Sequence, residues 1–403
     1  MEIDADVIPD DWDLKKLGEI ADVSSGGSAP QGDKFFDGEN PFIRVQHIEQ
    51  ASDSINRYDL ITDEAVKELK LKKYQSGTIV FPKSGASIYL EKRAVLPMDA
   101  YIVSHLCAVK SVKEDVDQNF LFYSLKQIPF SKGKADGYPT LNLSEVKRAI
   151  ILLPPIEEQR KIVCILSQIK KASAEQEQII TKVKELKQSL MHRLFTRGLR
   201  DEKLRETEIG SLPESWKVFK LGEVATLQRG NDLPRYEFKN GDIPVIGSNG
   251  CIGYHNQKIM DGPGVVTGRS GSIGKISYVP GPYWPHNTAL YVKNFHGNHP
   301  LFIFYLMHRL DFNKYKTGVS VPTLNRNFIH GEIVPVPDLQ EQIDIAETLS
   351  RTDKKIEQAE GQRGTLSNLF KTMLQLLMTG QVRVKDVDFD GVDAPIILLT
   401  STK

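Results

Sequence analysis

The chain has 403 residues, more than one hydrophobic core usually organises, so we expect at least two globular units. Its composition, 40% hydrophobic and 26% charged, with no apolar run near the roughly 18 residues of a membrane-spanning helix, excludes a membrane-embedded class. The net charge is zero, so any surface for a polyanion must be local. The N-terminus shows no signal-peptide pattern, which predicts a cytoplasmic protein, and the three cysteines lack the CxxC spacing of zinc sites.

The chain is internally duplicated. The copied segments are IPDDWDLKKLGEI (8–20) and LPESWKVFKLGEV (212–224), PTLN (139–142 and 322–325), and PPIEEQ (154–159) and PDLQEQ (337–342). The first pair is 204 residues apart and the other two pairs are 183 residues apart. The two copies therefore share their beginnings and ends but differ in the length between them. This pattern predicts one scaffold used twice, with divergent middles that carry different specificities.

The first middle, residues 13–150, contains segments typical of strands and segments typical of helices. Runs rich in β-branched and aromatic residues, at 78–90 and 100–110, predict strands, and residues 63–73 and 119–128 predict helices. Lysine and arginine balance aspartate and glutamate in this segment.

Heptad-spaced apolar residues follow both P-x-x-x-E-Q motifs and predict two long helices. The expected seam residues are Ile162, Ile165, Ile169, Ala172, Ile179, Val183, Leu186 and Leu190 in the first helix, and Leu349, Ile356, Leu366, Phe370 and Leu377 in the second. About 40 residues form a rod of roughly 60 Å. One exposed stripe of that length would be insoluble, so we expect an intramolecular antiparallel pair, the alternative being that each helix packs only on its own globular half. Gly361 and Gly364 predict a bend or a close helix contact in the second helix.

The second middle, residues 217–335, is rich in Gly, Pro and Asn and predicts a mostly β unit with a helix at 301–310. It holds 13 basic and 7 acidic residues, a net charge of +6 that is compatible with a polyanion surface or with ordinary solvated lysines. The string GRSGSIGKI at 268–276 has five residues between Gly and Gly-Lys, so it is not a P-loop. Arg269 and Lys275 fit contacts to DNA phosphate or a plain β-hairpin turn equally well.

Residue types with hydrogen-bond forks near turns point to base-edge recognition rather than catalysis, because Arg pairs bidentately with guanine and Asn or Gln with adenine. The DNA-binding candidates are Arg44, Gln46, His47, Lys83, Ser84, Arg93, Arg229, Asn231, Arg235, Ser248, Asn249, Arg269, Lys275 and Asn287. No set of residues has the spacing of a nucleophile with its base, a cofactor loop or a metal site, so we predict no catalytic, cofactor or metal residues.

The chain resembles the specificity subunits of type I restriction-modification systems. The resemblance lies in the WxxxxLGE starts at Trp12 and Trp216, both PTLN segments, both P-x-x-x-E-Q helix starts, and the strings IPVIGSNGCIGYH and DGPGVVTGRSGSIGK. It implies an α+β fold in which two target-recognition domains each read half of a split DNA site. Paired antiparallel helices would set the spacer and dock modification subunits, two of them. S-adenosylmethionine, ATP and Mg would belong to the modification and restriction subunits, and this chain would bind no cofactor and catalyse nothing.

The resemblance and the repeat together predict six segments. These are a first target-recognition domain (1–150), a spacer helix (151–200), a central linker (201–216), a second target-recognition domain (217–335), a second spacer helix (336–380) and a C-terminal tail (381–403). The first domain keeps the glycine pattern of RSGSIGK only in part, as KSGASIYLEKR at 83–93. The competing hypothesis is a coiled-coil protein adaptor without sequence-specific DNA binding, and an enzyme is disfavoured because no cofactor loop is found.

Overall fold

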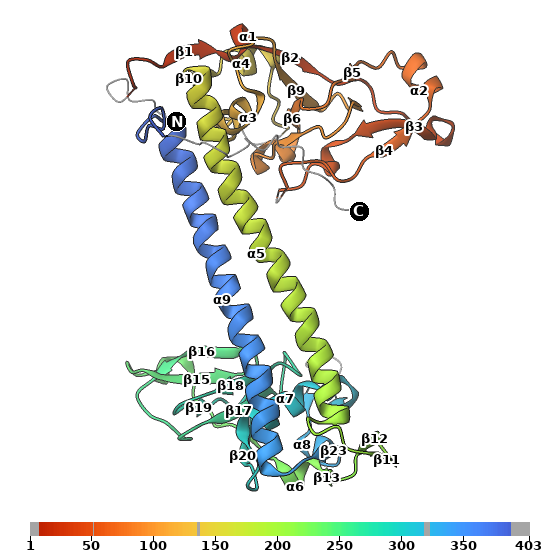
Figure 1. Ribbon diagram of the computed structural model, residues 1–403, viewed down its shortest axis with the longest axis vertical. Coiled ribbons are helices and arrows are strands. Elements are labelled where there is room, and N and C mark those ends of the chain that lie inside the picture. Colours follow the sequence, from red (N-terminus) through yellow and green to blue (C-terminus); the bar gives the residue numbers. More distant parts are fainter. Residues whose placement is uncertain (1–7, 51, 135–137, 318–322, 388–403) are drawn as a thin grey trace. The chain divides into compact units, whose positions relative to one another are not determined.

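The computed structural model describes residues 8–50, 52–134, 138–317 and 323–387 (Figure 1). Its residues group into two compact units, unit 1 with Met1–Glu175 and Gln362–Lys403, and unit 2 with Gln176–Gly361. The sequence placed divisions at the ends of the two long helices, whereas the bounds of these units fall inside them. Each unit therefore combines a globular part with one end of each long helix.

Unit 1 contains short strands and helices ahead of the first long helix. They are β1 (Asp13–Lys16), α1 (Leu17–Ile20), β2 (Ala21–Ser25), η2 (Asp33–Phe35), β3 (Phe36–Ile43), η3 (Val45–His47), β4 (Asp59–Ile61), α2 (Asp63–Glu68), β5 (Lys73–Tyr74), β6 (Ile79–Pro82), η4 (Ala86–Leu90), β7 (Ala94–Val95), β8 (Ala100–Ile102), β9 (Leu106–Ser111), α3 (Gln118–Lys126), α4 (Leu143–Lys147), β10 (Ile150–Leu153) and the start of α5 (Ile156–Arg197). The sheets have the orders β2-β9-β6-β7, β4-β3-β8-β5 and β1-β10.

The expected strand at 78–90 is only partly correct. The chain is extended in β6, whose four residues are all buried, and then turns into the 3-10 helix η4. Gly85 has a φ of +76°, a left-handed conformation that ends the extended run and that glycine adopts without strain. The helices expected at 63–73 and 119–128 are present as α2 and α3.

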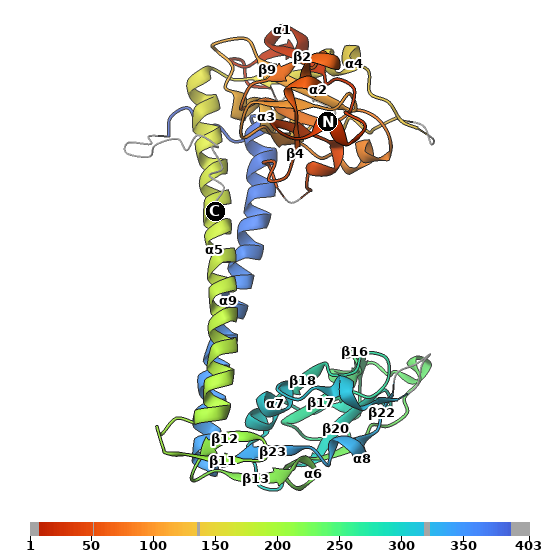
Figure 2. The same ribbon diagram turned by 90° about the vertical axis from the view of Figure 1, so that its right-hand side faces the viewer.

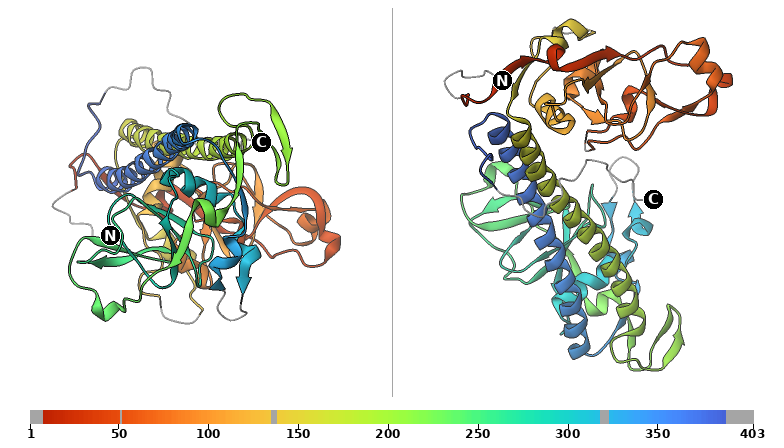
Figure 3. Two further views of the ribbon diagram at one scale, coloured as in Figure 1. Left: turned by 90° about the horizontal axis from the view of Figure 1, so that it is seen from below. Right: turned by 45° about the horizontal axis from the view of Figure 1, so that its top comes forward.

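Unit 2 repeats this arrangement in the part of the chain that follows α5. Its elements are β11 (Leu204–Thr207), β12 (Gly210–Pro213), β13 (Lys217–Lys220), α6 (Leu221–Val224), β14 (Thr226–Arg229), η5 (Arg235–Glu237), β15 (Ile243–Gly247), β16 (Gly250–His255), β17 (Gly264–Gly268), β18 (Ile276–Val279), β19 (Trp284–Pro285), β20 (Ala289–Asn294), α7 (Pro300–His308), η6 (Phe312–Tyr315), β21 (Lys316–Thr317), β22 (Thr323–Leu324), α8 (Arg326–Ile329), β23 (Ile333–Val336) and the start of α9 (Leu339–Met378). The β11–β12 hairpin follows the end of α5 and is drawn in yellow-green in Figure 3.

The two units share one sheet topology. The order β14-β20-β17-β18 in unit 2 matches β2-β9-β6-β7 in unit 1, strand for strand. The parallel pair β15–β19 likewise matches β3–β8, and β13–β23 matches β1–β10. Duplication of the scaffold, expected from the repeated motifs, is therefore visible in the hydrogen-bonded strand pairs.

The repeated LGE motif builds one corner in each unit. Leu17 and Leu221 are fully buried, which places the short helices α1 and α6 on their cores. Glu19 accepts a hydrogen bond from the backbone N–H of Lys16 at 3.2 Å, and Glu223 does so from Lys220 at 2.8 Å. A carboxylate at this place satisfies an unpaired N–H group at the start of a helix, so each motif sets where its helix begins.

The repeated tryptophan and the P-x-x-x-E-Q motif form a second, buried corner. Trp12 Nε1 donates to Glu158 in unit 1 at 3.2 Å, and in unit 2 the Trp216 Nε1 donates to Glu341 at 3.1 Å. Arg383, from the tail after α9, closes the corner in unit 1 with two hydrogen bonds to Glu158, at 2.7 and 2.9 Å. Burial raises the pKa of Glu158, but the hydrogen bonds from Arg383, the Val384 N–H and Trp12 outweigh it and leave this pKa lowered.

Helices α5 and α9 pair in both units (Figures 1 and 2). In unit 2, Lys184 pairs with Glu360 at 2.8 Å and Lys187 with Asp353 at 2.5 Å. The α9 number falls as the α5 number rises, so the pair is antiparallel. Among the described residues, no helix is long and apolar enough to cross a membrane.

The seam of α5 differs from the expected one at two positions. Ile179 is 38% exposed and Leu186 is 51% exposed, whereas Ile180 is buried. The expectation that Ile179 and Leu186 lie in the seam was wrong, because the buried face of α5 carries Ile180 instead of Ile179. The other named α5 seam residues, Ile162, Ile165, Ile169, Ala172, Val183 and Leu190, are buried or half-buried.

The α9 seam follows the expected register. Leu349 and Leu377 are fully buried, and Ile356, Leu366 and Phe370 are half-buried. The bend or close contact expected at Gly361 and Gly364 is absent from this described helix. The helix is continuous through both glycines, and a Cβ atom at either would meet nothing within 4 Å.

Candidate nucleic-acid interface

One end of the four-stranded sheet in unit 2 gathers many of the polar candidates. β14 ends at Arg229, β17 ends just before Arg269, and β20 begins just after Asn287. These strands are antiparallel neighbours. The ends of β14 and β17 and the start of β20 therefore lie at the same end of the sheet (Figure 2). We call this part of the sheet the β14–β17–β20 end.

The backbone of Arg269 is held at this end from both sides. Its N–H donates to the Thr288 carbonyl at 2.9 Å, and its carbonyl accepts from the Leu324 N–H, in the repeated PTLN segment, at 2.7 Å. Gly268 lies so close to the next turn that a Cβ atom there would be 1.8 Å from the Ser272 carbonyl oxygen. The glycine before Arg269 is therefore required by a close backbone approach.

Four side chains form a polar cluster here. The Asn287 amide nitrogen donates to the Asp232 carboxylate, and Arg229 Nη2 lies 3.9 Å from the same carboxylate. Arg269 Nη1 donates to the Asn287 carbonyl at 3.3 Å. Burial and the neighbouring Arg229 lower the pKa of Arg269, while Asp232 opposes the shift. With two arginines and one aspartate the cluster carries a net charge of +1.

The neighbouring turns hold two more candidates. Lys275 Nζ donates to the Asn249 backbone carbonyl at 2.8 Å and to its side-chain Oδ1 at 2.9 Å, and both residues are exposed. The string around Lys275 is the turn of the β17–β18 hairpin, with Gly271 and Gly274 in left-handed conformations. Ser248, half-buried, donates its backbone N–H to Thr288 Oγ1 at 3.3 Å.

Asn231 and Arg235 lie just beyond β14. The Asn231 backbone N–H donates to the Pro285 carbonyl at 2.8 Å, which ties this segment to β19. Arg235 is exposed in η5, next to Tyr236, which is 85% exposed. Both side chains are available at the surface to differing degrees, Asn231 being half-buried.

The matching end of unit 1, formed by β2, β6 and β9, holds Lys83 in the place of Arg269. The Lys83 N–H donates to the His105 carbonyl at 2.9 Å, and its carbonyl accepts from the Leu141 N–H in the other PTLN segment at 2.7 Å. Ser84 is buried, and its hydroxyl lies 2.5 Å from His105 Nδ1. The KSG and RSG strings thus occupy equivalent backbone positions, although the glycine pattern after them diverges.

Three candidates follow β3. Arg44 Nε donates to Asp59 at 2.5 Å, and the His47 ring lies 3.6 Å from the same carboxylate. His47 is buried, and its pKa is lowered because burial outweighs the attraction of Asp59. Gln46, between them, is exposed. The arrangement leaves Gln46 and part of Arg44 at the surface.

Arg93 does not reach the surface. It is 4% exposed, with its guanidinium 5.5 Å from the Phe81 ring centroid and 5.3 Å from that of Phe130. Its nitrogens donate to Glu91 and to the Ile128 carbonyl. The expectation that Arg93 contacts DNA directly is therefore corrected. Arg93 is a buried residue that supports the loop after β6.

The structure also brings forward residues that were not selected from the sequence. Ser25, Ser28 and Ser104 occupy in unit 1 the positions of Arg229, Asp232 and Asn287. The repeat spacings carry this correspondence, since the first two pairs are 204 residues apart and the third 183. Extending the repeats beyond the identical letters would have located Asp232 and the three serines.

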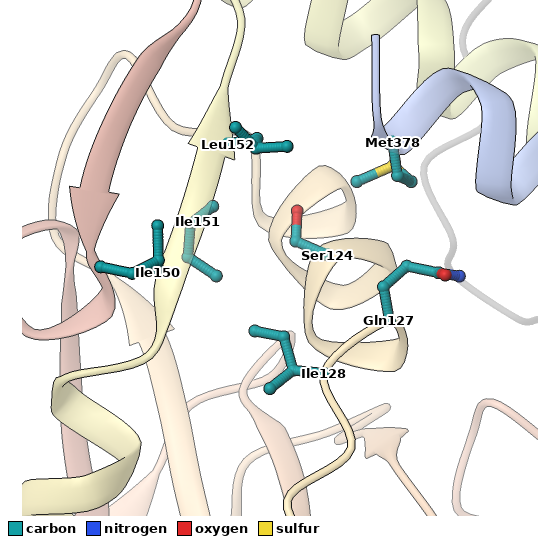
Figure 4. Close-up of a pocket in the computed structure, with 7 residues that line it drawn as sticks. All are labelled: Ser124, Gln127, Ile128, Ile150, Ile151, Leu152 and Met378. Atoms are coloured by element: carbon teal, nitrogen blue, oxygen red, sulfur yellow. The ribbon is translucent and has the colours of Figure 1, made fainter. Parts of the chain in front are cut away.

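Other chemistry has little support in the described residues. No group of three His, Cys, Asp or Glu side chains there could hold a metal ion. A pocket of about 230 Å³ lies between α3, β10 and the end of α9, lined by Ser124, Gln127, Ile128, Ile150, Ile151, Leu152 and Met378 (Figure 4). Its walls are mostly aliphatic, and none of the DNA-binding candidates lines it.

Comparison with known proteins identifies the family. The chain matches the type I restriction modification DNA specificity domain over residues 9–185 and again over 213–366. The chain belongs to this family. Its function is DNA sequence recognition as a specificity subunit, which is not a catalytic subunit, and the adaptor hypothesis is not favoured.

Relatives of similar length support this assignment. The MjaVIII specificity subunit of Methanocaldococcus jannaschii is 24% identical over 436 residues, covering 95% of each chain. The putative MjaX specificity subunit of the same organism is 24% identical over 409 residues, covering 94% of this chain and 95% of the relative.

Solved structures share the fold. The S subunit of a type I restriction-modification system from M. genitalium aligns with a TM-score of 0.62 at 16% identity, covering 94% of this chain and 98% of that one. A chain from a structure on complex assembly and conformational transition of the type I system aligns with a TM-score of 0.59 at 17% identity, covering 93% and 99%.

Proposed function

We propose that each unit reads one half of a bipartite DNA site through its sheet end, the β14–β17–β20 end in unit 2 and the β2–β6–β9 end in unit 1. The observation that carries this proposal is the pairing of one backbone frame with two different sets of side chains. In unit 2 the frame presents Arg229, Arg269 and Asn287, whose forked donors and acceptors match base edges. In unit 1 it presents Lys83, with Arg44 and Gln46 nearby, whereas Ser84 is buried.

The charges suggest unequal electrostatic shares. Unit 2 carries the segment of net charge +6, residues 217–335, whereas residues 13–150 are neutral. Phosphate contacts supply most sequence-independent affinity and make it salt-dependent. Unit 2 would therefore contribute more of the affinity of this chain, and unit 1 would depend more on partner surfaces. Exposed Lys275 remains a proposed phosphate contact, and exposed Arg235 remains a proposed base-edge contact.

The paired helices would set the number of unread base pairs and dock the modification subunits, two of them, with restriction subunits joining the complex. S-adenosylmethionine, ATP and Mg would be bound by those subunits rather than by this chain. An antiparallel pair with exposed outer faces on α5 and α9 is suited to such docking.

Methylation mapping tests the proposal. Genomic DNA from cells that carry the chain with its modification subunit is compared with DNA from cells that lack the chain. A split adenine-methylated motif that disappears with the chain is expected. Inserting one heptad into both helices should change only the spacer, and a change in either half-site would contradict the role of the helices. Methylation that persists without the chain would contradict the proposed function.

A further inference from the structure

An acidic side chain stands inside the proposed DNA-reading cluster of unit 2. Asp232 is exposed and accepts from Asn287, with Arg229 3.9 Å away. A carboxylate beside DNA repels phosphate and therefore lowers affinity for every sequence. A role for Asp232 in the proposed DNA-binding surface must therefore offset this loss of affinity.

The hydrogen bond to Asp232 determines which way the Asn287 amide points. A carboxylate only accepts, so the amide nitrogen must face it. One N–H of Asn287 is used in this bond, and the other N–H and the Oδ1 remain as an adjacent donor and acceptor. That pair matches the N7 acceptor and N6 donor of adenine in the major groove. A flipped amide would present the reverse pattern.

The rest of the cluster holds the backbone of the same residue, Asn287, in place. Arg269 donates to the Asn287 backbone carbonyl at 3.3 Å, and the Arg269 backbone is itself clamped by Thr288 and Leu324. Unit 1 uses a similar device, in which Asp59 holds Arg44 at 2.5 Å. Pre-oriented side chains lose less conformational entropy on binding and discriminate better.

We propose that Asp232 is a specificity-determining positioning residue, which orients the Asn287 amide, and with it Arg229, toward an adenine edge in the half-site read by unit 2. It lowers affinity for all DNA and raises discrimination at that base pair. This inference rests on the proposed function and adds the identity of the base edge and the residue that orients its reader.

The test uses the full complex of this chain with its modification subunits. Asp232→Ala should raise binding to non-specific duplex at low salt, because a negative charge is lost, and should lower discrimination at one A·T pair of one half-site by about tenfold. Methylation mapping should then show that position, and no position of the other half-site, becoming degenerate. Thermal unfolding should stay unchanged.

Two variants separate charge from geometry. Asp242→Ala removes the same charge from an exposed residue just before β15, and it should raise non-specific binding without altering the motif. Asp232→Asn removes the charge but keeps an Oδ1 that accepts from Asn287, so it should recover part of the lost discrimination. Asn287→Ala should lose as much discrimination as Asp232→Ala, and the double variant should lose little more.

The possible outcomes test the role of Asp232 separately from the proposed function. An unchanged motif in Asp232→Ala, or equal loss of methylation at all sites with an unchanged motif, would overturn the role of Asp232. A wild-type chain that directs no split motif would instead overturn the proposed function.

Discussion

The sheet ends of the two units carry different chemistry on the same backbone. Unit 2 places Arg229, Asp232 and Asn287 where unit 1 has three serines, at positions related by the repeat spacings. The backbone hydrogen bonds around them are conserved between the units, including the bond from each PTLN segment to the lysine or arginine carbonyl. The difference shows that one scaffold places different side chains at equivalent positions, and under the proposed function the residue identities would set what each end reads.

Glycines explain why the frame is so similar. Gly26 and Gly230 both lie directly against neighbouring backbone. A Cβ atom at Gly26 would be 2.0 Å from the Ile102 carbonyl oxygen, and a Cβ atom at Gly230 would be 2.2 Å from the His286 carbonyl oxygen. Backbone contacts this close cannot be relieved by rotating a side chain. Both ends therefore depend on glycine for the same reason.

The largest expected effect comes from breaking this shared frame. Gly26→Ala should destabilise unit 1 and Gly230→Ala should destabilise unit 2, each by about 3 kcal/mol, since the added methyl group forces the backbone apart. Hydrogen exchange resolved by segment measures each unit separately. Equal protection in variant and wild type would contradict the close packing. Variants that affect both units equally would contradict the local origin of the effect.

A smaller effect should distinguish the two buried corners. Arg383→Met leaves the Glu158 carboxylate, which is buried, without its charged partner, and should destabilise unit 1 by about 2 kcal/mol. Arg200→Met should cost less, because Arg200 is more exposed and lies 4.0 Å from Glu341. Hydrogen exchange near α5 and α9 would show which substitution destabilises its unit more. Equal losses of stability in the two variants would contradict the prediction.

The same corner predicts a pH dependence. The folded-state pKa of Glu158 is lowered, so its ion pair contributes stability at pH values above the ordinary glutamate range and loses it as the pH falls through the folded-state pKa. The difference between wild type and Arg383→Met should therefore shrink in acid. A difference that stays constant from neutral to acid pH would show that Arg383 acts by packing on Trp12 rather than by charge, its guanidinium lying 5.6 Å from that ring centroid.

The smallest expected change is a gain. Gly361→Ala should stabilise α9 by about 1 kcal/mol, because the glycine is exposed within a helix and a Cβ atom there meets no neighbour. Calorimetry or hydrogen exchange in α9 would detect it. A loss of stability would indicate that the helix needs this glycine for another conformation.

Much of the fold was predictable because its signals are local and repeated. The WxxxxLGE and P-x-x-x-E-Q motifs mark buried corners, as the hydrogen bond between Trp216 and Glu341 shows. The α9 seam followed its heptads. The α5 seam did so except at Ile179 and Leu186, which are exposed.

The residues proposed to read DNA were harder to select. Residue type alone brought Arg93 into the set, although two aromatic rings enclose it, and left out Asp232, which has no forked donor. Burial and orientation depend on strands distant in the chain, so no local pattern reveals them.

The duplication, the two long helices and the family can be read from the amino-acid sequence, because identical motifs at fixed spacings and apolar periodicity are properties of the chain alone. Which side chains share the sheet ends, and which face of α5 is buried, became known from the folded chain. Strand ends far apart in sequence meet only when the sheets form, and the exposure of each side chain depends on what then packs against it.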